Sequence, residues 1–139
     1  MSSDREDVLA VNAAFYAAFG SGDMDAMAEI WAETGPVACL HPGAPLLVGR
    51  DPVLNSWSHI LGASEMPEIA CFEPHAHLMG HSAFVTCYER LGGVGGAVLI
   101  ATNIFIRKND RWRMSHHHAS PAAVAPPERA GDAKPTVLH

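Results

Sequence analysis

Apolar residues recur at helical spacing in the N-terminal half of the chain. A Ser-x-x-Glu capping box opens at Ser3, and apolar residues follow every three or four positions as far as Gly20, which predicts an amphipathic helix. Asp23 can cap a second helix that ends before a Gly-Pro pair, and Asp51 followed by Pro52 announces a third. The chain therefore begins with two consecutive helices and reaches a third after a short interval.

Strand-like segments fill that interval and the region beyond residue 62. The short segment from Val37 to His41 places alternate side chains on one face, so that His41 stands at a strand end. Longer segments without helical periodicity are divided by glycine or polar turns and predict antiparallel strands over residues 68–78, 82–91, 94–108 and 112–121. Because Pro74 cannot donate a ladder hydrogen bond, we expect a bend or bulge in the first of them.

The strand predicted over residues 94–107 is apolar on both faces. One face carries Ala97, Leu99, Ala101, Asn103 and Phe105, and the other carries Val98, Ile100, Thr102, Ile104 and Ile106. A sheet with helices on one side only normally exposes polar residues on its other side. We therefore expect the second face to be covered by another copy of the chain, which predicts a homodimer.

Length and composition limit the classes of protein that need to be considered. The 139 residues suffice for one core, and we expect a single domain over residues 1–121 followed by a Pro- and Ala-rich tail over residues 122–139. Nine scattered Lys and Arg in a chain of net charge −6 argue against a nucleic-acid partner. Neither a signal peptide nor a membrane span is recognisable, which predicts a cytoplasmic protein. Three cysteines without Cys-x-x-Cys spacing predict free thiols.

Three consecutive histidines lie in the last predicted strand, which runs from Trp112 to Pro121. Strict alternation places Trp112, Met114, His116 and His118 on one face and His117 on the other. An apolar face that carries two imidazoles is typical of a pocket wall, so we expect His116 and His118 to contact a ligand and His117 to face outward.

A metal site is the rival interpretation of these histidines. His41, His116 and His118, with His75 or His77, would supply imidazoles for zinc or iron. No carboxylate falls within the histidine motif, so an organic-ligand pocket without metal or cofactor is the preferred interpretation.

Several stretches of the chain resemble a known superfamily. They are the segment Phe15-Tyr16-Ala17-Ala18-Phe19-Gly20-Ser21-Gly22-Asp23, the segment Cys39-Leu40-His41-Pro42-Gly43, and Thr102-Asn103-Ile104-Phe105 followed by Trp112 to Pro121. Over residues 4 to 121 the chain is similar to the SnoaL-like branch of the nuclear transport factor 2-like superfamily, which has a cystatin-like fold and includes ketosteroid isomerase. The resemblance implies an α+β cone-shaped roll, in which three N-terminal helices pack on a strongly curved, mostly antiparallel sheet.

The same resemblance implies candidate site residues. His41-Pro42 matches the aspartate-proline pair that carries the general base of ketosteroid isomerase, and Asn103 matches its protonated aspartate in the oxyanion hole. The isomerase tyrosine falls on Phe15, with Tyr16 one position away. Because Phe15 cannot donate a hydrogen bond, a faithful steroid isomerase is not expected.

Two functions follow from this likeness and remain open at this point. The first is a proton-transfer enzyme (isomerase, dehydratase or cyclase) for a hydrophobic small molecule, with His41 as base and Asn103 as hydrogen-bond donor. The second is a ligand-binding or dimerisation domain without catalysis. In both, the expected pocket wall consists of Phe15, Tyr16, Trp31, Trp57, Trp112, His116 and His118.

Overall fold

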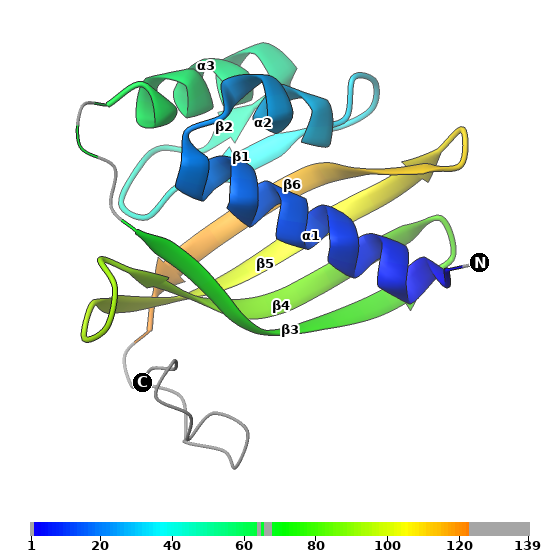
Figure 1. Ribbon diagram of the computed structural model, residues 1–139. Coiled ribbons are helices and arrows are strands. Elements are labelled where there is room, and N and C mark those ends of the chain that lie inside the picture. Colours follow the sequence, from blue (N-terminus) through cyan, green and yellow to red (C-terminus); the bar gives the residue numbers. More distant parts are fainter. Residues whose placement is uncertain (1, 64, 66–67, 123–139) are drawn as a thin grey trace.

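A computed structural model describes residues 2–63, 65 and 68–122, and it has the expected α+β architecture (Figure 1). Three helices precede the long strands: α1 (Asp4–Ser21), α2 (Met24–Ile30) and α3 (Arg50–Leu61). The six strands are β1 (Ala38–Leu40), β2 (Leu47–Val48), β3 (Ile69–Met79), β4 (Ser82–Leu91), β5 (Ala97–Lys108) and β6 (Arg111–Pro121). The predicted tail from residue 123 onward lies outside the described residues.

The strands form one mixed sheet in the order β2-β1-β6-β5-β4-β3. β1 runs parallel to β6, and the other neighbours are antiparallel. Helix α1 lies along the curved sheet, while α2 and α3 lie beside the β1–β2 end (Figure 1). All three helices cover the same face of the sheet, and the core lies between them and that face. The predicted cone-shaped roll is confirmed.

The first two helices begin with the N-caps that the sequence predicted. The Ser3 hydroxyl accepts from the backbone N–H of Glu6, and the Glu6 side chain accepts from the backbone N–H of Ser3, which completes a capping box. Asp23 caps α2 by accepting from the backbone N–H of Ala26. The third helix begins one residue before the predicted cap, with Gly49 as its N-cap.

Two irregularities shape the long strands. The register between β3 and β4 shifts between Phe72 and His75, where Pro74 interrupts the ladder, so the predicted bulge is confirmed. A second register shift occurs in the pairing of β5 with β6, because Ile104 pairs with His116 and Phe105 pairs with Met114. Ser115 is therefore an extra residue on β6, and its hydroxyl donates to the carbonyl oxygen of Pro36 at 2.5 Å.

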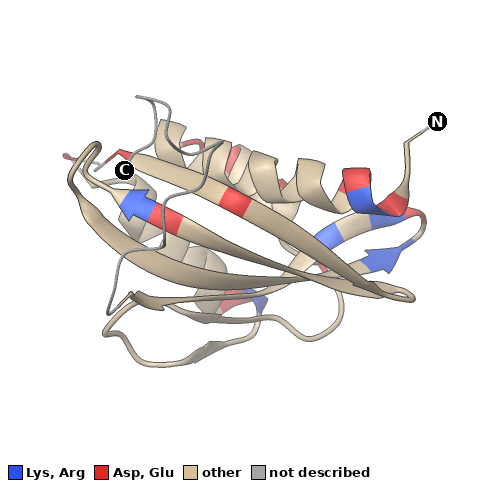
Figure 2. Ribbon diagram, turned by 90° about the horizontal axis from the view of Figure 1, so that it is seen from below, with Lys and Arg blue, Asp and Glu red and all other residues tan. Residues whose placement is uncertain are grey.

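Figure 2 shows that few positions along the strands are occupied by charged residues. On β5 the predicted division is confirmed, because Leu99, Ala101, Asn103 and Phe105 are buried on the inner face. Ile100, which points outward, is 47% exposed. Within the described residues, no helix is long and apolar enough to cross a membrane.

Candidate functional site

Polar side chains gather inside the cone, on the inner face of the sheet beneath α1. Each residue is at most 7% exposed, although the surrounding core is apolar. They come from four elements: Asn12 and Tyr16 from α1, Cys87 and Glu89 from β4, Asn103 from β5, and His117 from β6. Buried polar groups are costly unless they are paired, so this group must be held together by hydrogen bonds.

Asn103 lies at the centre of that hydrogen-bonded network. Its Nδ2 donates to Oδ1 of Asn12 at 2.8 Å and to the hydroxyl of Tyr16 at 3.2 Å. Its Oδ1 lies 2.6 Å from Nδ1 of His117. Because an amide oxygen only accepts hydrogen bonds, Nδ1 of His117 carries the proton in this arrangement. The neutral imidazole then has its lone pair on Nε2.

Glu89 occupies the other end of the network. The Tyr16 hydroxyl donates to Oε2 of Glu89 at 2.5 Å, and it also lies 3.3 Å from Sγ of Cys87. Oε2 of Glu89 lies 3.9 Å from Nε2 of His117, which is too long for a hydrogen bond. The carboxyl group and the imidazole thus face each other without direct contact.

Burial shifts the pKa values of these two groups in directions that favour their neutral forms. It raises the pKa of Glu89 above its ordinary value, although the hydrogen bond from Tyr16 opposes the shift. Burial, together with the smaller effects of the nearby His41, His116 and His118, lowers the pKa of His117 to about 3. Both shifts favour an uncharged carboxyl group beside an uncharged imidazole.

His41 lies at the edge of this network. It is half-buried, and its Nε2 lies 3.0 Å from the hydroxyl of Ser56, which itself donates to the carbonyl oxygen of Val53. Burial lowers its pKa. Its ring centroid is 6.4 Å from that of His117, which in turn bonds to Asn103. His117 thus stands between His41 and Asn103, where we expected a gap for a ligand.

The orientation predicted for the histidine triplet was wrong. Trp112 and Met114 point inward as expected, but the extra residue Ser115 reverses the alternation beyond it. His117 is 2% exposed inside the cone, whereas His116 and His118 lie on the outer face. His116 there lines a surface hollow of about 400 Å³.

The reversed orientation of the histidine triplet also separates the imidazoles that were considered as metal ligands. His41 faces the cone interior, while His116 and His118 lie on the opposite side of the sheet. These three rings do not converge on one point. Within the part of the chain that the structure describes, no group of three His, Cys, Asp or Glu side chains is placed to hold a metal ion.

Two of the predicted aromatic residues surround His117. The ring of Phe15 is 4.9 Å from its imidazole, and Trp57 is 5.9 Å from it while also contacting His41 at 4.9 Å. Tyr16 supplies the hydroxyl that its neighbour Phe15 lacks. Trp31 and Trp112 are buried in the core, but among the described residues no ring contact joins them to His117.

A family model described as a SnoaL-like domain matches residues 8–124. The chain belongs to the SnoaL-like family. A solved structure from Streptomyces avermitilis, proposed to be a dehydratase of the NTF2-like family, is 36% identical to this SnoaL-like chain. The match covers 87% of the chain and 97% of the other protein, with a TM-score of 0.78.

Two further relatives have different descriptions. A structure from Thiobacillus denitrificans, proposed to be a calcium/calmodulin-dependent protein kinase type II association domain, is 33% identical, with a TM-score of 0.73 and coverage of 82% and 94%. The F-box protein SKIP8 of Arabidopsis thaliana is 30% identical over 113 residues. This SnoaL-like chain spans 48% of that protein, about half its length, and the match covers 81% of the chain.

Sequence reasoning missed Glu89 and His117 as site residues. Glu89 had a signal, because it shares the inward alternation of Ala83, Val85 and Cys87 on β4 and is the charged member of that series. No sequence signal identified His117, since strict alternation along β6 predicted an outward orientation for it.

Proposed function

We propose that this SnoaL-like protein is a cofactor-independent proton-transfer enzyme, of the isomerase or dehydratase type, for a hydrophobic small molecule. The observation that carries the proposal is the facing pair of Glu89 and His117, buried at 1% and 2% exposure and 3.9 Å apart. A neutral acid beside a neutral base is what such a reaction requires.

His117 serves as the general base through Nε2. Its hydrogen bond to Asn103 orients the ring and holds the proton on Nδ1, which leaves the lone pair of Nε2 for the substrate. Asn103 is accordingly a positioning residue, and Asn12 and Tyr16 hold its amide in place. This differs from the role expected for Asn103 as a direct donor to the substrate.

Glu89 serves as the general acid. A substrate that places its oxygen ~2.8 Å from Oε2 of Glu89 and the adjacent C–H group against Nε2 of His117 would bridge the two residues, which face each other at 3.9 Å. Glu89 would protonate a leaving hydroxyl group or a developing enolate, while His117 accepts the proton from carbon. The Tyr16 hydroxyl, bonded to Oε2, stabilises the carboxylate that results.

The substrate reaches this pair beside His41. His41 is half-buried and contacts Trp57, and both rings adjoin His117, so this is the side of the network from which we propose that the substrate enters. Phe15 and Trp57 supply apolar contact area for a hydrophobic substrate. The likeness to a protein proposed to be a dehydratase supports this reaction class.

The test measures proton exchange at carbon. Hydrophobic ketones and β-hydroxycarbonyl compounds are incubated with the protein in D₂O, and deuterium incorporation and loss of water are followed by mass spectrometry. We expect His117→Asn and Glu89→Gln each to slow the reaction about 100-fold or more, as loss of a general acid or base does. His116→Asn is the matched control, because it removes an imidazole from the same strand on the outer face.

The results can contradict the proposal in two ways. Turnover by the wild type that survives in both His117→Asn and Glu89→Gln would place the chemistry elsewhere. Absence of exchange with all of these compounds would remove this reaction class. Circular dichroism of each variant separates lost chemistry from lost folding.

A homodimer through the outer sheet face is the second proposal. Its supports are the exposed apolar side chains of that face, such as Ile100, and the likeness to a protein proposed to be a kinase association domain. Light scattering should show a dimer, and Ile100→Asp should convert it to a monomer. Val94→Asp is the control, because it places the same charge at an 81% exposed position in the β4–β5 turn.

A further inference from the structure

A surface hollow of about 390 Å³ lies at the β5–β6 hairpin, away from the buried network. Its lining combines the two strands with the segment that follows α2: Ala32, Glu33, Thr34, Ile106, Lys108, Asn109, Arg111 and Arg113. Ile106, Lys108, Arg111 and Arg113 belong to the outward-facing positions of their strands. The hollow therefore opens on the outer side of the sheet.

The charge of this hollow is opposite to that of the chain. Three of the nine Lys and Arg line it, although the protein has a net charge of −6. Glu33 is the acidic residue among the lining side chains, which leaves a local excess of two positive charges. Asp110 lies in the adjacent turn, and Asp4 is engaged with Arg107 at 3.2 Å. Such a concentration of cations attracts anions.

The guanidinium groups have hydrogen-bonding capacity to spare. Arg113 is 15% exposed, and its contact with Glu33 is 3.9 Å, which is an ion pair but too long for a hydrogen bond. Within the described residues, neither Arg113 nor Arg111 donates a side-chain hydrogen bond. An arginine presents five N–H groups in a fork that matches carboxylate and phosphate oxygens.

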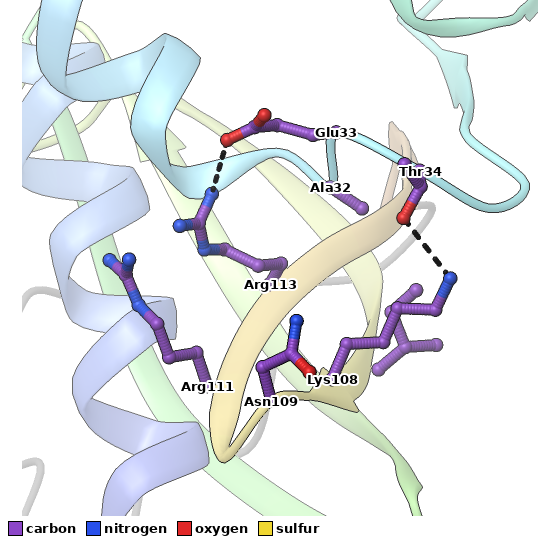
Figure 3. Close-up of a pocket in the computed structure, with 8 residues that line it drawn as sticks. Ala32, Glu33, Thr34, Lys108, Asn109, Arg111 and Arg113 are labelled. Carbon is purple, nitrogen blue, oxygen red and sulfur yellow. Dashed lines mark hydrogen bonds and ion pairs between the residues drawn. The ribbon is translucent and has the colours of Figure 1, made fainter.

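The lining side chains also have a suitable arrangement. Figure 3 shows Arg113 reaching toward Glu33 and Lys108 toward Thr34, with the amide of Asn109 between them and Arg111 at the rim. Nζ of Lys108 donates to the Thr34 hydroxyl at 3.1 Å, which holds the ammonium group at the side of the hollow. Positive φ angles at Asn109 and Asp110, 53° and 61°, form the tight turn that keeps both strands together here.

We propose that this hollow binds a small anion through its phosphate or carboxylate group. Arg113 and Lys108 contact the anion from two sides, Asn109 and Thr34 add uncharged donors, and Arg111 contributes charge at the rim. The Glu33 side chain is 73% exposed, so it turns into solvent when the anion takes its place beside Arg113. This site is independent of the proton-transfer proposal, because it shares no residue with the buried network.

Isothermal titration calorimetry with inorganic phosphate and with citrate tests the site on the full chain. We expect saturable binding of at least one of the two, weakened by added salt. Lys108→Gln and Arg113→Gln should each weaken it about tenfold, the effect of one lost charge-assisted hydrogen bond. Phosphate binding alone would assign a phosphoryl group, and citrate binding alone would assign a carboxylate.

Glu33→Gln gives the sharpest result, since it removes the competing carboxylate and should tighten binding. Arg90→Gln is the matched control. Arg90 pairs with Val98 near the start of β5, at the other end of the sheet from the β5–β6 hairpin, so removal of its positive charge should leave binding unchanged. Absence of saturable binding of both anions overturns the proposal. So does an equal loss in Arg90→Gln and Lys108→Gln, which would indicate a response to net charge alone.

Discussion

Nε2 of His117 faces Oε2 of Glu89 across 3.9 Å, and a hydrogen-bonded chain through Asn103 and Tyr16 joins the two residues from behind. Both side chains are nearly inaccessible to solvent. Burial raises the pKa of Glu89 and lowers that of His117, so it favours the uncharged form of both groups. This one relationship determines how the protein should respond to pH and to substitution within the cone.

Glu89 and His117 give the free energy of unfolding opposite dependences on pH. The pKa of His117 is ordinarily 6.5 and is about 3 in the fold, so its contribution falls as pH drops from 6.5 to 3. The pKa of Glu89 is raised above 4.5 in the fold, so its contribution falls as pH rises from 4.5 to the raised value. Each group alone gives a slope of about 1.4 kcal/mol per pH unit. The two slopes cancel where these windows overlap, and an acid limb remains below pH 4.5.

Urea denaturation between pH 4 and pH 9 measures this profile. Glu89→Gln should leave the His117 slope unopposed, so that stability rises between pH 4.5 and pH 6.5, and Glu33→Gln should leave the profile unchanged, because Glu33 is mostly exposed. The acid limb also contains contributions from His41 and His116, whose pKa values burial lowers too. The same profile in Glu89→Gln and the wild type would show that the fold does not raise the pKa of Glu89.

Tyr16→Phe should destabilise the protein by about 1–3 kcal/mol, because it removes the hydroxyl that donates to Glu89 and accepts from Asn103. The buried carboxyl group of Glu89 would then lose its hydrogen-bond donor, while the Asn103 amide would keep its bonds to Asn12 and His117. Tyr88→Phe removes the same atom from a half-buried ring that stacks on Phe72 on the outer face, and should change stability by less than about 0.5 kcal/mol. Equal effects of the two substitutions would remove the network's role in stability.

Gly96→Ala should impair folding of the β4–β5 hairpin. A Cβ at this position would collide with the backbone carbonyl of Leu91, which cannot move without breaking the turn. Gly43→Ala is the comparison, because Gly43 has a φ of 71° but open space around it, so that only about 1 kcal/mol of backbone strain is expected. Thermal unfolding of both variants would show the difference, and a similar melting temperature would contradict it.

Cys39 should resist alkylation in the folded protein. The side chain is fully buried, and burial raises the pKa of its thiol to about 12. Because the thiolate is the reactive form, iodoacetamide at pH 8 should label Cys39 only after unfolding. Peptide mass spectrometry with and without guanidinium locates the label. Rapid labelling of Cys39 in the native protein would mean that this side of the cone opens readily.

The pattern of the chain predicted the fold well, because helix caps, glycine turns and alternation act locally. Ser3 and Asp23 predicted the helix caps, and Pro74 predicted the bulge in β3, that the structure contains. The interior of the site was harder to predict. The roles of Glu89 and His117 depend on strand register, and a single bulge residue changes the register without any signature in composition. Tyr16 was expected at the pocket, but its bonds to Glu89 and Asn103 required the packing of α1 against β4 and β5.

Ser115 selects which imidazole of the triplet belongs to the interior. If Ser115 were paired as an ordinary ladder residue and not as a bulge, β6 would alternate without interruption and direct His116 and His118 into the cone in place of His117. A basic nitrogen would still face the interior, but displaced by one residue, about 3.3 Å, along the strand. A run of three identical side chains therefore keeps an imidazole on this wall of the cone when the register shifts by one residue, although the position of the imidazole changes.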